Sequence, residues 1–292
     1  MIKLDLYSVF NEVAKTQNFT IAAKLLFVSQ PAVSQSISQL ESDLGTRLFT
    51  RTSKGVHLTS EGKLLYEYTH AGISLIKNGE QRLIDSKNLL IGQLRIGVGD
   101  TISRYYLIDY LERFNSIYPK IKLRIINKTT LELVQMIKSG EIDLGVCNLP
   151  IYDKSLQITP IEEIQDIFVA GDKFKELKNK TISFKDLENY PLIMLDKRSR
   201  TRQYLESFLI GKAVNIVPEI ELGSHDLLLE FAKIGLGIAC VVKEYSYEQI
   251  KKNELFQVRT MEEIPKRSIG VCTLSGVALS PAAKRFADIL IN

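Results

Sequence analysis

One predicted helix carries a face of neutral side chains that can form hydrogen bonds. Ser29 is a good N-cap, Pro31 lies in the first turn, where its missing N–H costs little, and Gly45 is placed to end the helix. The apolar stripe consists of Val33, Ile37, Leu40 and Leu44. At about 100° per residue, the opposite face collects Pro31, Ser34, Gln35, Ser38 and Ser42. Gln can pair with adenine N6 and N7, and Ser with several partners, so this face is suited to reading base edges in a DNA groove.

Two shorter helices are expected before this one. Apolar residues recur at helical spacing between residues 4 and 15, and Thr20 is expected to cap a second helix with the sequence IAAKLL. The polar stretch 16–19 separates the two. A basic segment, LFTRTSKGVHLT, follows the third helix, with no acidic residue between Leu44 and Ser60. This pattern fits a β-hairpin wing on DNA phosphates. Together the elements predict a winged helix-turn-helix.

The string LLFVSQPAVSQSISQLESDLGTRLFTRTSKGVHLTSEGKLLYEY resembles the N-terminal domain of the LysR-type transcriptional regulators, through SQPAVS, QLE, LG, LF, R and LTSEG in their expected order. The resemblance implies that a DNA major groove is faced by Gln30, Pro31, Ser34, Gln35 and Ser38. It also implies that the wing, with Arg51 and Lys54, holds the DNA backbone. Family members often carry Arg or Lys in the recognition helix, but this chain has no basic residue between Lys24 and Arg47. An A·T-rich or shape-dependent operator is therefore favoured over guanine contacts.

A long helix is predicted from Thr59 to about Lys87, since no proline interrupts the helical pattern there. It would span roughly 40 Å, which is long for a helix packed within a small domain. Leu65, Tyr68, Gly72, Leu75 and Gly79 follow a 3-4 spacing. Glycine inside a helix costs about 1 kcal/mol unless another backbone approaches closely. We expect a dimerisation helix, as the resemblance also implies; the alternative is an amphipathic helix packed on its own chain.

Strand and helix patterns alternate beyond this helix. One βαβαβ unit is formed by QLRIGVG, RYYLIDYLERFNSIY, IKLRIIN, LELVQMIKSG and IDLGVC, and a second unit extends from DIFVAG to ELFQVRT. RSIGVCT and PAAKRFADIL close the chain. The phrases LRIGVG, YLERFNSIYPKIKL, GEIDLGV and AKIGLGIA resemble the family's effector-binding domain, so the resemblance covers nearly the whole chain.

The implied fold class is α/β, with a winged helix-turn-helix, a linker helix and a two-subdomain α/β effector-binding domain of periplasmic-binding-protein type. The expected boundaries are 1–58 for DNA binding, 59–90 for the linker and 91–292 for effector binding. Subdomain I is expected to hold 91–163 and 267–292, and subdomain II 164–266.

Four segments of the predicted effector domain lie at helix starts. Free N–H groups at such positions favour anions, and clefts of α/β sheets lie outside the carboxyl ends of the strands. The candidate effector-binding residues are Asp100, Thr101, Ile102, Ser103, Lys128, Thr129, Thr130, Asn148, Ser199, Arg200, Thr201, Ser224 and His225. A small anionic effector is favoured by the positive charge of Lys197, Arg198, Arg200 and Arg202. The alternative is that the hydroxyls are helix caps and the charges are solvated. His225 could sense protonation, although a lone His is more often structural.

Other function classes fit the sequence less well. A dinucleotide-dependent enzyme would need a third glycine after Gly97-Val98-Gly99, where Ile102 stands, and no nucleophile with a partnered base is found. A transporter's solute-binding protein would need an export signal and has no use for residues 1–58. A regulator without an effector also remains open. The three cysteines lack metal or disulfide spacing and are expected to be buried thiols, and no cofactor is expected.

The net charge of +4 alone does not imply nucleic acid. The expected protein is cytoplasmic and not an enzyme. It would bind a near-palindromic promoter as a dimer or tetramer and act there on RNA polymerase.

Overall fold

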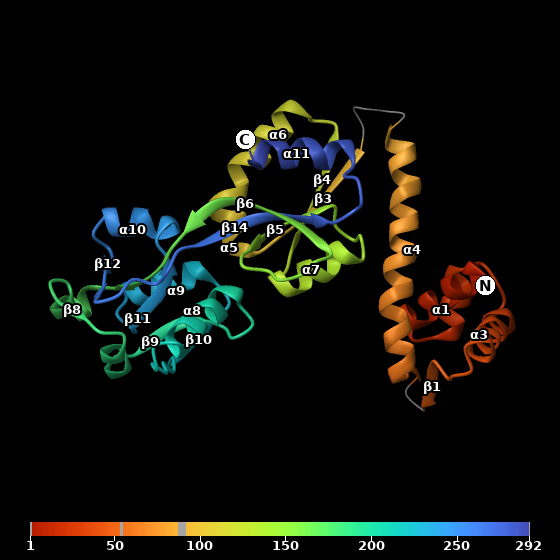
Figure 1. The fold of residues 1–292 in the computed structure, drawn as a ribbon, viewed down its shortest axis with the longest axis horizontal. Helices are drawn as coiled ribbons and strands as arrows, with labels where there is room; N and C mark the ends of the chain where they lie inside the picture. The colour runs from red at the N-terminus through yellow and green to blue at the C-terminus, as the bar shows by residue number, and fades with distance from the viewer. Residues whose placement is uncertain (1, 53–54, 87–91, 292) are drawn as a thin grey trace. The chain divides into compact units, whose positions relative to one another are not determined.

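The computed structural model describes residues 2–52, 55–86 and 92–291 (Figure 1). The chain divides into two compact units, Met1–Ile84 and Asp85–Asn292. Within the described ranges, no helix is both long enough and apolar enough to cross a membrane.

The first unit consists of three helices, a hairpin and a long helix. These are α1 (Leu4–Thr16), α2 (Phe19–Leu25), α3 (Gln30–Leu44), β1 (Phe49–Thr52), β2 (Gly55–Leu58) and α4 (Ser60–Ser86). The Ser29 hydroxyl caps α3 by accepting from the Ala32 N–H, and Gly45 ends the helix with a left-handed φ of 67°. These two caps were predicted, and they are confirmed.

Two details of this unit differ from expectation. Asn18, not Thr20, caps α2, because its side-chain oxygen accepts from the backbone N–H groups of both Thr20 and Ile21. The apolar stripe of α3 ends at Leu40, since Leu44 is exposed and Glu41 is the buried residue of the last turn.

The core of the first unit gathers apolar side chains from all three short helices and the hairpin. Phe10, Val33, Leu40 and Leu48 are almost completely buried there. Leu65 of α4 packs against this core. In the single chain, Gly72 and Gly79 of the same helix have open space where a Cβ would stand.

The second unit contains two five-stranded sheets. The first part of its chain forms β3 (Gly92–Val98), α5 (Asp100–Ile102), α6 (Ile108–Ile117), β4 (Ile121–Asn127), α7 (Thr130–Lys138), β5 (Leu144–Asn148) and β6 (Leu156–Ile164). The middle part forms β7 (Asp166–Ala170), β8 (Thr181–Ile182), β9 (Leu192–Leu195), α8 (Arg200–Ile210), β10 (Ile220–Leu222), α9 (His225–Lys233), β11 (Ile238–Val242), α10 (Tyr247–Lys251), β12 (Phe256–Gln257) and β13 (Arg259–Thr260). The chain then returns through β14 (Arg267–Leu274) and α11 (Pro281–Ile291).

The first sheet has the strand order β4-β3-β5-β14-β6, and the second has the order β10-β9-β11-β7-β12. We call the parts built on these sheets subdomain I and subdomain II. In the first sheet β3 runs parallel to β4 and β5, whereas β14 runs antiparallel to β5 and β6. The paired strands β6 and β14 carry the chain between the subdomains (Figure 1). The chain therefore crosses twice, between Ile164 and Asp166 and again before Arg267.

Helices cover both faces of the first sheet. Phe114 of α6 and Phe286 of α11 share one core with alternate side chains of β3, and Leu133 of α7 belongs to another core on the opposite face. A Cβ on Gly97 would lie 2.5 Å from the ends of the Leu133 and Ile142 side chains, so a larger residue there would force these core side chains to shift. Cys147, Cys240 and Cys272 are buried free thiols, as predicted.

Candidate functional site

The polar face of α3 is open to solvent. Gln30, Pro31, Gln35 and Ser38 are exposed, and Ser34 is half-buried with its hydroxyl accepting from Gln30 Nε2 at 2.9 Å. The face is therefore available to a duplex along the helix, with neutral donors and acceptors at its surface.

A buried carboxylate joins α3 to the hairpin. Glu41 Oε1 accepts from the backbone N–H groups of Leu48, at 2.7 Å, and Phe49, at 3.2 Å. Its other oxygen pairs with Arg47 at 2.9 Å. Arg47, which directly precedes the basic segment of the hairpin, thus already has a carboxylate partner. The backbone of Arg51 lies in β1, opposite Val56, and Lys54 lies outside the described residues.

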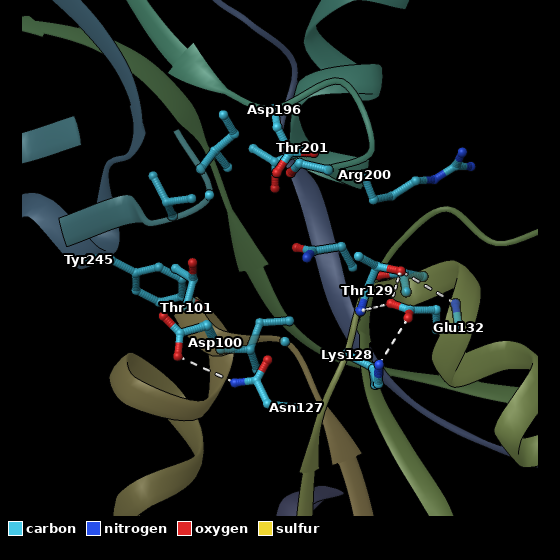
Figure 2. Close-up of a pocket in the computed structure, with 18 residues that line it drawn as sticks. Asp100, Thr101, Asn127, Lys128, Thr129, Glu132, Asp196, Arg200, Thr201 and Tyr245 are labelled. Atoms are coloured by element: carbon cyan, nitrogen blue, oxygen red, sulfur yellow. Dashed lines mark hydrogen bonds and ion pairs between the residues drawn. The ribbon is translucent and has the colours of Figure 1, made fainter. Parts of the chain in front are cut away.

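The second unit holds a cavity of about 270 Å³ between its two subdomains. Ten predicted effector-binding residues line it: Asp100, Thr101, Ile102, Lys128, Thr129, Thr130, Asn148, Ser199, Arg200 and Thr201. Figure 2 shows Asp196 and Thr201 on one side and Asp100 and Asn127 on the other. The cavity therefore joins loops that lie far apart in the sequence but follow strands or begin helices.

Three predicted residues, Ser103, Ser224 and His225, do not line this cavity. Ser103 begins a π-helical turn, Ser103–Leu107, and Ser224 is the N-cap residue of α9. His225 is 2% exposed, and its Nε2 accepts from the Val242 backbone N–H at 3.2 Å. Burial lowers the pKa of His225 to about 4, so the ring is neutral at pH 7. Its position fits the structural alternative considered from the sequence.

Several lining residues were missed by sequence reasoning. They are Gly99, Asn127, Glu132, Leu195, Asp196, Gly223, Val242 and Tyr245. Asn127 is the last residue of β4, and Asp196 directly follows β9. The rule that clefts form at the carboxyl ends of strands would have found both.

The charged lining differs from the basic rim that the sequence suggested. The carboxylates of Asp100, Glu132 and Asp196 outnumber the two cations, Lys128 and Arg200. Lys128 pairs with Glu132 at 3.2 Å. Arg200 donates from Nε and Nη2 to the Pro150 carbonyl oxygen, at 3.2 and 2.7 Å, and points away from Asp100 in Figure 2.

The three other basic residues of that predicted rim are absent from the lining. Lys197 and Arg198 lie outside it, and Arg202 is buried and paired with Glu206 at 2.7 Å. An anionic group bound here would therefore rely on neutral donors rather than on unpaired cations.

Two helix N-termini at the cavity differ in their capping. At α7, the Glu132 carboxylate accepts from the Thr129 N–H at 2.9 Å and from its hydroxyl at 2.7 Å, which forms a capping box. The hydrogen bond from the Thr129 side chain is the main reason why the pKa of Glu132 falls to about 2. At α8, the N-cap residue Ser199 makes no side-chain capping bond. The α7 terminus is thus neutralised by its own chain, whereas the α8 terminus is open.

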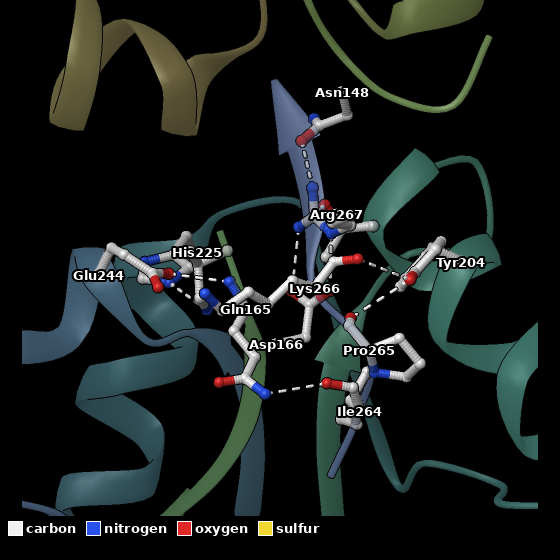
Figure 3. A network of polar contacts seen from close by, with 12 residues as sticks. Asn148, Gln165, Asp166, Tyr204, His225, Glu244, Ile264, Pro265, Lys266 and Arg267 are labelled. Carbon is white, nitrogen blue, oxygen red and sulfur yellow. Dashed lines mark hydrogen bonds and ion pairs between the residues drawn. The ribbon is translucent and has the colours of Figure 1, made fainter. Parts of the chain in front are cut away.

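A buried arginine underlies the cavity at the crossing between subdomains (Figure 3). Arg267 donates from Nε and Nη2 to the two oxygens of Asp166, at 2.7 and 3.0 Å, and these side chains are 1% and 0% exposed. Its Nη1 donates to Asn148 Oδ1 at 2.6 Å, and its Nη2 donates to Thr201 Oγ1 at 3.0 Å. Arg267 therefore contacts a lining residue of each subdomain. No local sequence signal marked it, because its partners come from distant segments.

Two family models match the chain. Residues 4–63 match the model described as "Bacterial regulatory helix-turn-helix protein, lysR family", and residues 87–292 match the "LysR substrate binding domain". The "RuBisCO operon transcriptional regulator" of Allochromatium vinosum is 27% identical over 292 residues, covering 100% of this chain and 96% of that protein. The "Uncharacterized HTH-type transcriptional regulator YbhD" of Escherichia coli (strain K12) is 26% identical over 293 residues, covering 99% of this chain and 91% of that protein.

Solved structures show the same fold. Full-length OxyR from Pseudomonas aeruginosa superposes with a TM-score of 0.69 at 19% identity, covering 100% of this chain and 94% of that one. The regulatory domain of CcmR from Synechocystis, solved in complex with 2-PG, has a TM-score of 0.63 at 24% identity. It covers 68% of this chain and 96% of its own.

Proposed function

Because the chain belongs to the lysR family of bacterial regulatory helix-turn-helix proteins, a family of transcriptional regulators, we propose that a small effector bound between subdomains I and II controls its action on a promoter. The observation that carries this proposal is the pairing, in one chain, of an exposed polar recognition face on α3 with a separate cavity lined from two subdomains. The proposed division remains 1–58, 59–90 and 91–292, with crossings near Ile164 and Ile264 to Lys266.

On the DNA side, the exposed Gln and Ser side chains of α3 read base edges and the hairpin holds phosphates. Dimerisation along α4 places two copies of this DNA-binding domain on a near-palindromic operator. The exposed apolar residues Leu64, Tyr68 and Leu83 of α4 support this role, as do the open spaces at Gly72 and Gly79. A tetramer and contact with RNA polymerase at the promoter belong to the same proposal, as does a cytoplasmic location.

On the ligand side, effector binding shifts the population of the subdomain arrangements, and that shift alters DNA bending or half-site spacing. The CcmR regulatory domain, which shares this fold, was solved with 2-PG, and this supports a small effector here. An anionic group fits the neutral donors of the cavity and the open N-terminus of α8. We infer no catalytic role for the cavity, because the lining hydroxyl of Thr129 that donates to the Glu132 carboxylate belongs to the capping box of α7.

Footprinting of the purified protein on its own upstream region tests the DNA role. The expected result is a protected near-palindrome whose half-sites lie about one or more helical turns apart. Uniform weak protection, or none, on both this region and an unrelated duplex would contradict the proposal. Repeating the footprint with candidate metabolites tests the effector role, because a true effector changes the protected length or the hypersensitive positions.

A further inference from the structure

Two residues that line the cavity, Asn148 and Thr201, contact the buried Arg267, and we call them the floor of the cavity. A guanidinium group has five N–H donors and no acceptor, so every polar atom that meets Arg267 must accept. Asn148 therefore turns its carbonyl oxygen toward Arg267, and Thr201 presents its oxygen lone pair. Asp166, fully buried on the other side, fixes the guanidinium in this orientation through two hydrogen bonds.

These two residues keep their donors free, since only their oxygens are engaged by Arg267. Among the described residues, nothing accepts from the Asn148 amide N–H groups or from the Thr201 hydroxyl. Both residues line the cavity, one from each subdomain. Thr201 also lies in the first turn of α8, whose N-terminus has no side-chain cap. The floor is thus a site for ligand acceptors such as the two oxygens of a carboxylate.

The sides of the cavity, by which we mean Asp100 and Asp196, offer hydrogen-bond acceptors instead of donors. Asp100, from subdomain I, accepts from Asn127 Nδ2 at 3.3 Å. Asp196, from subdomain II, accepts from the Arg198 N–H at 2.9 Å and has the exposed Arg198 Nε at 3.6 Å. Each carboxylate has two oxygens, so each keeps capacity to accept more hydrogen bonds. These sides are therefore suited to ligand donors.

From this arrangement, we propose that the effector is a small carboxylic acid with an amino or hydroxyl substituent. Its carboxylate accepts from Asn148 and Thr201 on the floor, and its substituent donates to Asp100 or Asp196. The inference rests on the proposed function of the cavity and adds the ligand's class and orientation. A doubly charged phosphate fits less well, since three carboxylates and two engaged cations line the site. A volume of about 270 Å³ suits a small molecule.

The arrangement also explains how such a ligand would close the cleft. The carboxylate of the ligand contacts both subdomains, because Asn148 belongs to subdomain I and Thr201 to subdomain II, and the substituent adds a contact to Asp100 of subdomain I or Asp196 of subdomain II. A ligand that lacks the carboxylate would lose the link between the subdomains, and one that lacks the substituent would lose the added contact. Both ends are therefore needed for the full effect.

The test is a thermal-shift and calorimetric titration of the full-length protein with matched two- to four-carbon compounds. The panel contains each unsubstituted acid, its hydroxy and amino derivatives, the corresponding amine, and inorganic phosphate. We expect at least one substituted acid to raise the melting temperature by several degrees, with its unsubstituted acid and its amine at least tenfold weaker. Comparison of the hydroxy and amino derivatives identifies the substituent.

Variants locate the carboxylate. Asn148→Asp keeps the oxygen that accepts from Arg267 but replaces the free amide donor with an anionic acceptor, so it should weaken the ligand about 10- to 100-fold. Thr201→Val should weaken it about tenfold, and Thr201→Ser should restore binding. Asn215→Asp, at an exposed position, adds the same charge as a control and should bind like the wild type.

The inference is overturned if no acid in the panel binds, if phosphate or an amine binds best, or if both floor variants bind the acid normally. These outcomes do not contradict the proposed DNA-binding function, provided that the wild type still protects its operator. Loss of operator protection, by contrast, would count against the proposed function and not against the ligand's class.

Discussion

The polar face of α3 and the floor of the cavity both consist of neutral hydrogen-bonding side chains, yet they are supported in different ways. The polar face lies on one continuous helix whose opposite side packs in the apolar core of the first unit, and its side chains extend into solvent. The cavity floor combines Asn148 and Thr201 from two subdomains and depends on the buried pair of Arg267 and Asp166. Changes on the polar face of α3 should therefore affect recognition alone, whereas changes beneath the cavity floor should affect stability as well.

The largest expected effect is that of Arg267→Met. It leaves Asp166 buried without its cationic partner, and breaking a buried pair in this way costs about 3–5 kcal/mol. Urea denaturation followed by circular dichroism should show an earlier transition of the second unit. Replacing Asp166 by Leu in the same chain should recover part of the loss. A denaturation midpoint equal to that of the wild type would show that the floor does not depend on this pair.

The next effect is a pH dependence caused by His225. Its folded-state pKa of about 4 lies below its ordinary value of 6.5, because burial disfavours the charged ring. The stabilisation is present above pH 6.5 and is lost as the pH falls toward 4, by up to about 3 kcal/mol over this window. His225→Gln keeps an acceptor for the Val242 N–H and should flatten this part of the stability curve. Parallel curves for the two proteins would exclude His225 as the cause.

A smaller effect, confined to DNA binding, is expected for Gln35→Ala. If this exposed side chain makes a bidentate base contact, its loss costs about 1–3 kcal/mol at one operator position. Binding to a set of operators with single base-pair changes measures this, and unfolding in urea should match the wild type. Equal weakening on every duplex would instead assign Gln35 to non-specific contacts.

The smallest effect is expected for Arg51→Ala in β1. A phosphate contact contributes about 0.9 to the slope of log binding constant against log salt concentration, independently of sequence. The variant should bind all duplexes more weakly at low salt and show a flatter slope. An unchanged slope would mean that this residue does not neutralise a phosphate. The Arg51→Ala and Gln35→Ala variants together distinguish contacts to the DNA backbone from contacts to base edges within one domain.

Local signals predicted the short helices and the two caps of α3, but not the polar contacts that join distant segments. Ser29 and Gly45 mark the ends of α3 because capping depends on the adjacent backbone alone. Leu44 was assigned to the apolar stripe and Glu41 was not singled out, since helical spacing does not show that the N–H groups of the hairpin hold a carboxylate in the interior.

The cavity shows the same limit on a larger scale. The rule about strand ends and helix starts predicted ten of its lining residues, because the sheet topology brings those loops together. The sequence also suggested a basic rim around Arg200, yet each cation of the lining is already engaged. A charged side chain is free only if no other segment contacts it, and the tertiary fold determines those contacts. Arg200 is an example, because it donates to the Pro150 carbonyl oxygen.

The contacts of Glu41 with the start of the hairpin affect how the domain can fit a DNA groove. By holding the start of β1 against the last turn of α3, this link fixes the distance between the side chains proposed to read bases and the strand proposed to hold phosphates. We expect this link to keep that distance unchanged when the domain binds DNA. The duplex must then adjust its own groove width to the protein, and sequences that bend or narrow at low energetic cost would be preferred at base pairs that no side chain touches.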